Sequence, residues 1–136
     1  MNKNLVQLIN AIILLSCYSC NSEPSGNCIK FHNGKFEIRN ELDGSVTTII
    51  RNGKRQMEFS PGRPDTIHSS IRWLSECEYQ INFLPIDPDS IDSMAQFLQR
   101  NTINVKILKT EKDYYIFRAS MQGIEQTLTD TIRLID

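Results

Sequence analysis

The chain has 136 residues, of which 40% are hydrophobic and 23% are charged, which is enough for one compact domain. Fifteen basic and sixteen acidic residues give a formal net charge of -1 and are interspersed along the sequence. No basic field is available to attract phosphates, so nucleic acid is not an expected partner.

The first sixteen residues have the layout of an export signal. Lys3 follows Met1, and the chain is then mostly apolar from Leu5 to Leu15. This run is shorter than the about 20 apolar residues that span a membrane, so we expect it to be removed. The sequence Leu14-Leu15-Ser16-Cys17 resembles the lipobox of bacterial lipoproteins. The resemblance implies that Cys17 is acylated and becomes the first residue of the mature protein.

An acylated Cys17 defines three segments. Residues 1–16 are the signal peptide, 17–27 a flexible polar tether, and 28–136 the folded domain. Attached acyl chains would anchor the protein to a membrane at about 0.8 kcal/mol per buried CH₂, with the domain in the periplasm. An ordinary secretory signal and a secreted protein are the alternative.

Export permits disulfides that the cytoplasm would reduce. Cys28 and Cys77 both belong to the domain and are the natural pair, while Cys20 remains as a spare thiol in the tether. A bridge between them would stabilise the domain by roughly 3–4 kcal/mol. A zinc site needs four closely spaced ligands, which His32 and His68 do not complete, so we predict no metal and no cofactor.

From Phe31 onward the hydrophobic pattern has period two, which is typical of short antiparallel strands. We predict a strand over Gly34–Asn40, followed by a hairpin whose strands flank Asn52-Gly53. This dipeptide favours a type I′ turn, in which both central residues have positive φ. The hairpin strands are Val46–Arg51 and Lys54–Ser60, and Pro61 and Pro64 then form a loop.

The next two strands have apolar inner faces. Ile67, Ser69, Ile71 and Trp73 share one face of the first strand, and Cys77, Tyr79, Ile81 and Phe83 share one face of the second. His68 and Ser69 are adjacent in this strand and point to its opposite faces, so the two are not expected to form a catalytic pair.

The aromatic residues of these two strands have two interpretations. Arg72-Trp73 and Glu78-Tyr79 could mark a binding surface, because such residues anchor interfaces. We favour the alternative that Trp73 and Tyr79 stack in the core while Arg72 and Glu78 pair across the outer face.

One helix is expected in the domain. Asp87-Pro88-Asp89 has the composition of a helix start, and Ile91, Met94, Ala95 and Leu98 form one apolar stripe that ends near Arg100. Strands then resume over Ile103–Thr110, Tyr114–Met121 and Ile124–Leu134. One of the adjacent tyrosines Tyr114 and Tyr115 should be inside and the other exposed.

The predicted fold class is all-β with one short helix. About eight strands joined by short turns form an antiparallel up-and-down meander, and closure into a small barrel would remove the exposed edges. A two-layer β-sandwich is the alternative.

The chain resembles two known families, the first of them in its barrel architecture. Gly34-Lys35-Phe36 resembles the Gly-x-Trp motif that opens lipocalins, with Phe in place of Trp. The chain also resembles a family of small Bacteroidetes-type lipoproteins of unknown function, sometimes labelled DNA topoisomerase IV, an activity that so short an exported chain could not host. That likeness rests on Cys28, Gly34-Lys35-Phe36, Ile50-Arg51, Gln56-Met57-Glu58, Ile71-Arg72-Trp73 and Cys77-Glu78-Tyr79.

These features predict a monomeric, non-catalytic envelope protein that binds a small apolar ligand or an envelope protein. The residues expected to line the ligand or the core are Phe36, Ile38, Trp73, Tyr79 and Phe83. The alternative is an interaction or assembly module whose core is filled, since small barrels are packed rather than hollow. A cavity of roughly 300 Å³ or more would favour the binding protein.

Overall fold

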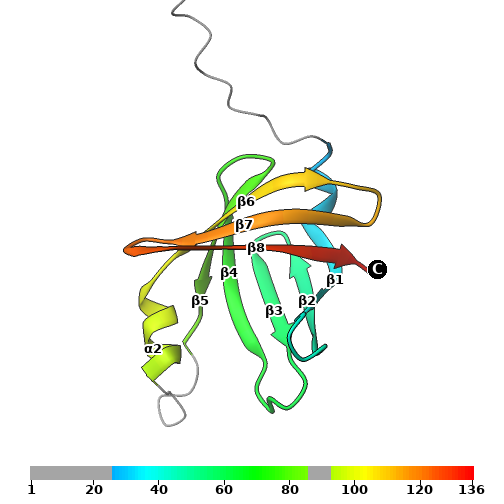
Figure 1. The fold of residues 1–136 in the computed structure, drawn as a ribbon. Helices are drawn as coiled ribbons and strands as arrows, with labels where there is room; N and C mark the ends of the chain where they lie inside the picture. Colours follow the sequence, from blue (N-terminus) through cyan, green and yellow to red (C-terminus); the bar gives the residue numbers. More distant parts are fainter. Residues whose placement is uncertain (1–25, 86–92) are drawn as a thin grey trace, which may run out of the picture.

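A computed structural model describes residues 26–85 and 93–136. Eight antiparallel strands follow one another around a closed barrel, and β8 pairs with β1 (Figure 1). The predicted all-β barrel with one short α-helix is confirmed, and the alternative two-layer β-sandwich is excluded. The elements are η1 (Ile29–Phe31), β1 (Asn33–Arg39), β2 (Val46–Asn52), β3 (Arg55–Phe59), β4 (Ile67–Trp73), β5 (Glu78–Phe83), α2 (Ser93–Arg100), β6 (Ile103–Thr110), β7 (Tyr114–Met121) and β8 (Ile124–Leu134).

The β2–β3 hairpin forms where it was predicted, but its turn differs in detail. Asn52 pairs with Arg55, so the two central residues are Gly53 and Lys54 rather than Asn52 and Gly53. Gly53 has φ +52° and no non-glycine residue among the described ones has positive φ. The predicted type I′ turn is therefore wrong. Glycine at the first central position is the pattern of a type II′ turn, which also suits the strand twist.

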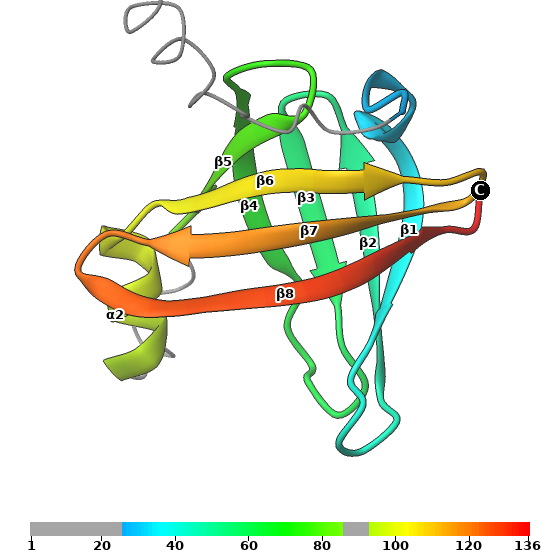
Figure 2. The same cartoon turned by 45° about the horizontal axis from the view of Figure 1, so that its top comes forward.

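The strands form two groups that cross the molecule at different angles. In Figure 2, β6, β7 and β8 run across the molecule at a steep angle to β1–β4. The β6–β7 and β7–β8 registers each shift once, between Ile107 and Lys109 and between Ala119 and Met121. Such irregularities bend and twist strands locally. They help these strands wrap the barrel.

A short 3-10 helix, η1, closes one end of the barrel, which we call the plug end. Sequence analysis missed this helix, because three residues carry no periodic signal. Phe31 of η1 is fully buried. The predicted disulfide is confirmed: Cys28, directly before η1, is bonded to Cys77, 49 residues further along the chain. The bridge fastens the plug to the start of β5.

The core lies between the plug and the middle of the barrel. Its buried apolar residues alternate along the strands with half-buried or exposed ones, as period two requires. They are Cys28, Phe31, Phe36, Ile49, Ile71, Tyr79, Ile81, Val105, Ile107, Tyr115, Phe117 and Ile132.

The helix α2 lies beside β5. Its predicted start at Asp87-Pro88 and the stripe residue Ile91 fall outside the described residues. Leu98 is half-buried, and Asn101 closes the last turn by donating its side-chain N–H to the carbonyl oxygen of Phe97 at 2.7 Å. Among the described residues, no helix has the length and hydrophobicity needed to cross a membrane.

Candidate binding site at the barrel mouth

Arg51 is the most unusual residue of the barrel interior. Its side chain points inward from β2 and is 2% exposed. Nε and Nη2 both donate to Gln56 Oε1, at 3.1 and 2.8 Å. Nη1 donates to the carbonyl oxygen of Phe31 at 3.0 Å and to the Tyr115 hydroxyl at 3.1 Å, and Nη2 donates to the Tyr79 hydroxyl at 3.2 Å. All five guanidinium N–H donors therefore have acceptors. One of these acceptors, the carbonyl oxygen of Phe31, belongs to the plug helix η1.

The acceptors of Arg51 are all neutral. Burial alone would lower the pKa of Arg51, but the hydroxyls of Tyr79 and Tyr115 raise it on balance, so the group stays charged. Burial raises the pKa of Tyr115, which remains a phenol. The nearest carboxylate in this network is Glu58, which accepts a hydrogen bond from Gln56 Nε2 at 2.7 Å. The side-chain amide of Gln56 thus links the two charged groups, accepting from Arg51 and donating to Glu58.

Aromatic rings complete the plug end. The guanidinium carbon of Arg51 lies 5.1 Å from the ring centroid of Phe36, 5.9 Å from Trp73 and 4.9 Å from Tyr79. Trp73 stacks on His32 with 3.4 Å between centroids and lies 4.5 Å from Tyr79. Desolvated cation–π contacts of this kind contribute up to about 2 kcal/mol each. These rings surround the Arg51 guanidinium in the barrel interior.

Trp73 and Tyr79 are opposed in the β4–β5 register and their ring centroids lie 4.5 Å apart, but the rings are tilted by 46° rather than stacked as predicted. The predicted pairing of Arg72 with Glu78 is wrong. Arg72 donates two hydrogen bonds to Gln80 Oε1, and Glu78 instead forms a salt bridge with Lys106 at 3.2 Å. The register places Gln80 opposite Arg72, which leaves Glu78 opposite Lys106.

The opposite end of the barrel, the mouth, contains a pocket created by incomplete strand pairing. β1 pairs with β8 at two positions, Phe36 with Leu134 and Glu37 with Arg133. Beyond them β1 continues to Arg39 alongside β2, whereas β8 from Leu128 to Thr131 pairs with β7. The two strands that close the barrel therefore separate toward the mouth.

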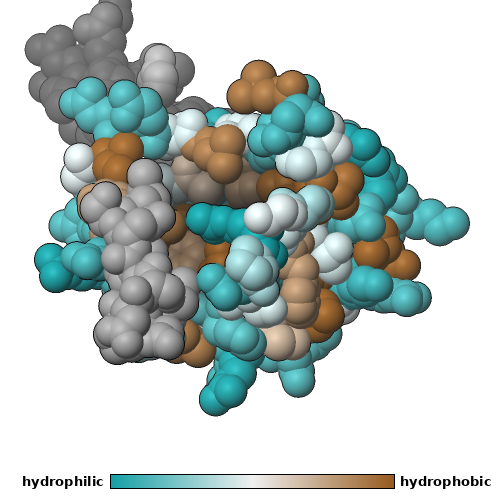
Figure 3. Space-filling view, turned by 90° about the horizontal axis from the view of Figure 1, so that it is seen from below, coloured by the Kyte–Doolittle hydropathy of each residue, from teal (hydrophilic) through white to brown (hydrophobic). Residues whose placement is uncertain are grey.

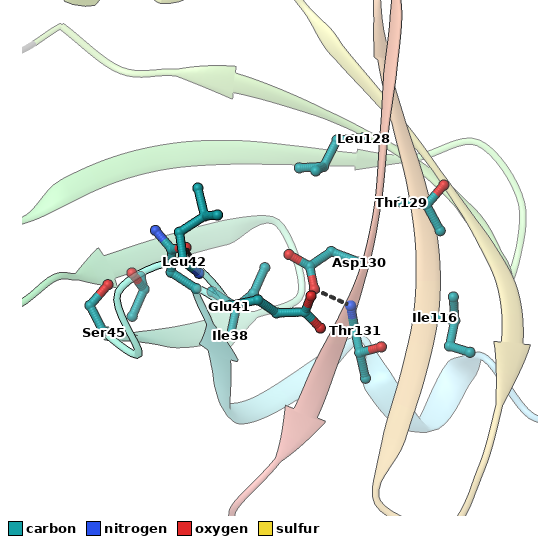
Figure 4. A pocket seen from close by; sticks show the side chains of 11 residues that line it. Ile38, Glu41, Leu42, Ser45, Ile116, Leu128, Thr129, Asp130 and Thr131 are labelled. Atoms are coloured by element: carbon teal, nitrogen blue, oxygen red, sulfur yellow. Dashed lines mark hydrogen bonds between the residues drawn. The ribbon is translucent and has the colours of Figure 1, made fainter.

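This separation leaves a pocket of about 600 Å³, which we call the seam pocket. Its size lies within the range of small-molecule sites. Figure 4 shows its two walls, the β1–β2 turn on one side and β8 with β7 on the other. The lining residues are Ile38, Asn40, Glu41, Leu42, Ser45, Thr47, Ile116, Leu128, Thr129, Asp130 and Thr131.

The seam pocket is amphipathic. Leu42 is 97% exposed and Leu128 is 56% exposed, so apolar side chains lie uncovered on both walls. Two carboxylates, Glu41 and Asp130, lie among them, and no lining residue is basic. Seen from the mouth end, hydrophobic and polar side chains are interspersed over the face (Figure 3).

Glu58 and Ser69 are further polar residues on the inner face of the barrel, outside the lining of the seam pocket. Glu58 is half-buried and stands opposite Ile49 and Ile67 in the registers of its neighbours. Burial raises its pKa, although the hydrogen bond from Gln56 and the charge of Arg51 oppose this. Ser69 is fully buried and its hydroxyl has no hydrogen-bond partner.

The predicted ligand or core residues do not form one site. Phe36 and Tyr79 lie in the core, Trp73 packs against it, and Phe83 is half-buried on β5. Of the five, Ile38 lines the seam pocket. The proposed acylation site, Cys17, lies outside the described residues.

Sequence analysis missed Arg51, Gln56 and Asp130 as inward-facing groups. Of the tyrosine pair, Tyr115 is fully buried and Tyr114 is half-buried rather than exposed. A signal for Asp130 was present in β8, where this residue stands in the inward series between Leu128 and Ile132. A carboxylate in an otherwise apolar face is a mark of function or pairing.

Within the described residues, no group of three or more His, Cys, Asp or Glu side chains could hold a metal ion. No protein-family model matches the chain, and no curated protein matches it either.

Proposed function

We propose that this protein is a non-catalytic binding protein of the bacterial cell envelope, anchored by a lipid at Cys17, that takes a small, largely apolar ligand into the seam pocket. The observation that carries the proposal is the pocket itself, about 600 Å³ between two strands that elsewhere close the barrel. Uncovered apolar side chains in a concave site are the usual mark of a ligand site.

The contrast between the two ends supports this assignment. At the plug end every guanidinium donor of Arg51 is used and aromatic rings fill the space. At the mouth, Leu42 and Leu128 have no comparable cover. Rigid packing on one side and an open apolar pocket on the other suit a scaffold that holds a ligand.

The binding half of the proposal can be tested with n-decanol and isothermal titration calorimetry. We expect the wild type to bind decanol and Ile38→Trp, which fills the seam pocket, to lose it. Ile124→Trp is the matched control, because Ile124 is 38% exposed on β8 and does not line the pocket. Equal binding by both variants, or no binding by the wild type, would contradict a site in the seam pocket.

The anchoring half is tested separately by metabolic labelling with a fatty acid. The wild type should take up label and a Cys17→Ala variant should not. Equal labelling of both proteins would exclude lipidation at this residue, and release into the medium would favour a secreted protein. Native mass spectrometry of protein purified from its own envelope would show the lipid, the disulfide and any bound molecule together.

A further inference from the structure

We propose that the ligand of the seam pocket is a cationic amphiphile, a molecule with an apolar body and a protonated amine or similar positive head group. This inference rests on the proposed function and adds the charge of the ligand. It follows from charge complementarity between such a head group and the two carboxylates on opposite walls of the pocket, Glu41 and Asp130.

The two carboxylates have capacity left for a ligand. One oxygen of Asp130 accepts a hydrogen bond from the backbone N–H of Thr131 at 2.6 Å. Within the part of the chain that the structure describes, Glu41 has no hydrogen bond or ion pair, and neither carboxylate has a basic partner. Figure 4 shows both carboxyl groups pointing into the space between the β1–β2 turn and β8.

The turn that carries Glu41 is held in place by its own hydrogen bonds. The Asn40 side chain accepts from the N–H of Leu42 at 2.9 Å, and the Asp43 side chain accepts from the N–H of Ser45 at 2.9 Å. The Asn40 N–H donates to the carbonyl oxygen of Ser45 at 2.8 Å. Glu41 and Leu42 are therefore presented side by side in sequence on a braced turn, one offering charge and the other apolar surface.

Nothing in the lining would favour an anion. A fatty acid would bring its carboxylate toward two others in a pocket without a basic side chain, and like charges at short range are unfavourable. A neutral amphiphile would fill the apolar part and leave both carboxylates unmatched. A cationic one satisfies the two kinds of surface together.

The test compares three ligands with the same chain length, n-decylamine, n-decanol and n-decanoate, by titration calorimetry against the full domain. Glu41→Gln/Asp130→Asn removes both carboxylates, and Asn at 130 can still accept from the Thr131 N–H. Glu76→Gln/Glu125→Gln is the matched control, because it changes the net charge equally with exposed residues that do not line the pocket. Thermal unfolding of each variant verifies the fold.

We expect the wild type to bind decylamine roughly three- to tenfold more tightly than decanol, which is the range for two partly exposed ion pairs, and decanoate most weakly. This preference should vanish in the pocket variant, persist in the control and shrink at high salt. Equal binding of decylamine and decanol would overturn the charge inference and leave the proposed function standing. Tighter binding of decanoate would do the same, whereas no binding of any of the three would overturn both.

Discussion

The buried guanidinium of Arg51 should be worth several kcal/mol to the fold, and Arg51→Met tests this. Methionine keeps an apolar stem but removes five donors. The hydroxyls of Tyr79 and Tyr115 lie 3.1 Å apart and retain each other as partners. The oxygens of Gln56 and Phe31 do not, and a buried acceptor left without a donor costs about 1–3 kcal/mol.

Two such orphaned acceptors, together with the lost cation–π contacts, give an expected loss of about 3–5 kcal/mol, the range found when one member of a buried charged network is removed. For a domain of this size that corresponds to a fall in Tm of roughly 12–20 °C. Arg51→Lys should recover little, because an ammonium group cannot reach acceptors on several sides at once.

The assay is urea unfolding followed by the fluorescence of Trp73, the single tryptophan, whose ring lies 5.9 Å from the guanidinium. Arg72→Met is the matched control, since Arg72 is exposed on β4 and its loss should change stability by less than about 0.5 kcal/mol. If Arg51→Met proved as stable as the wild type, the network would not be what holds the plug, and the reasoning would fail.

Three further predictions concern stability. A glutamate whose pKa is raised in the folded state contributes stability at low pH that is lost as the pH rises. Glu58→Gln should therefore be more stable than the wild type at pH 7 and equally stable below about pH 4. A difference in stability that stays constant between these pH values would refute this prediction. Gly34→Ala should lower the free energy of unfolding in urea by roughly 1–3 kcal/mol, because φ of Gly34 is +137° and a Cβ there would lie 2.8 Å from Leu134 Cδ1. An unchanged unfolding midpoint would show that the strand can shift to accept the methyl group. Removing the bridge by Cys28→Ala/Cys77→Ala should cost about 4 kcal/mol for a 49-residue separation, and a reductant should then no longer affect Tm.

Local sequence patterns predicted most of the fold. The bounds of β6, β7 and β8 agree with the prediction because alternation there is regular and turn residues separate the strands. The Cys28–Cys77 pair was predicted from the expected export of the chain and from a count of the cysteines left in the domain. The β2–β3 turn was displaced by one residue, since sequence signals a turn more reliably than its register.

Neither the Arg51 network nor the seam pocket could be predicted in the same way. Arg51 lies one residue before the end of β2, a position where charge is ordinarily solvated, and its partners Tyr79 and Tyr115 lie 28 and 64 residues away. The seam pocket depends on where β8 leaves β1, which is decided by the tilt and bulges of the whole barrel. No local pattern encodes that point.

The distribution of charge along the barrel connects these observations. Near the plug, the buried cation Arg51 is surrounded by neutral acceptors and all of its donors are used, so its guanidinium has no donor left for a ligand. Near the mouth, Glu41 and Asp130 line a pocket with no basic side chain. The described chain also enters the barrel at the plug end, where Cys28 precedes η1 (Figure 1). The start of the described domain and the seam pocket therefore lie at opposite ends of the barrel, so the proposed lipid at Cys17 would be tethered to the end away from the pocket.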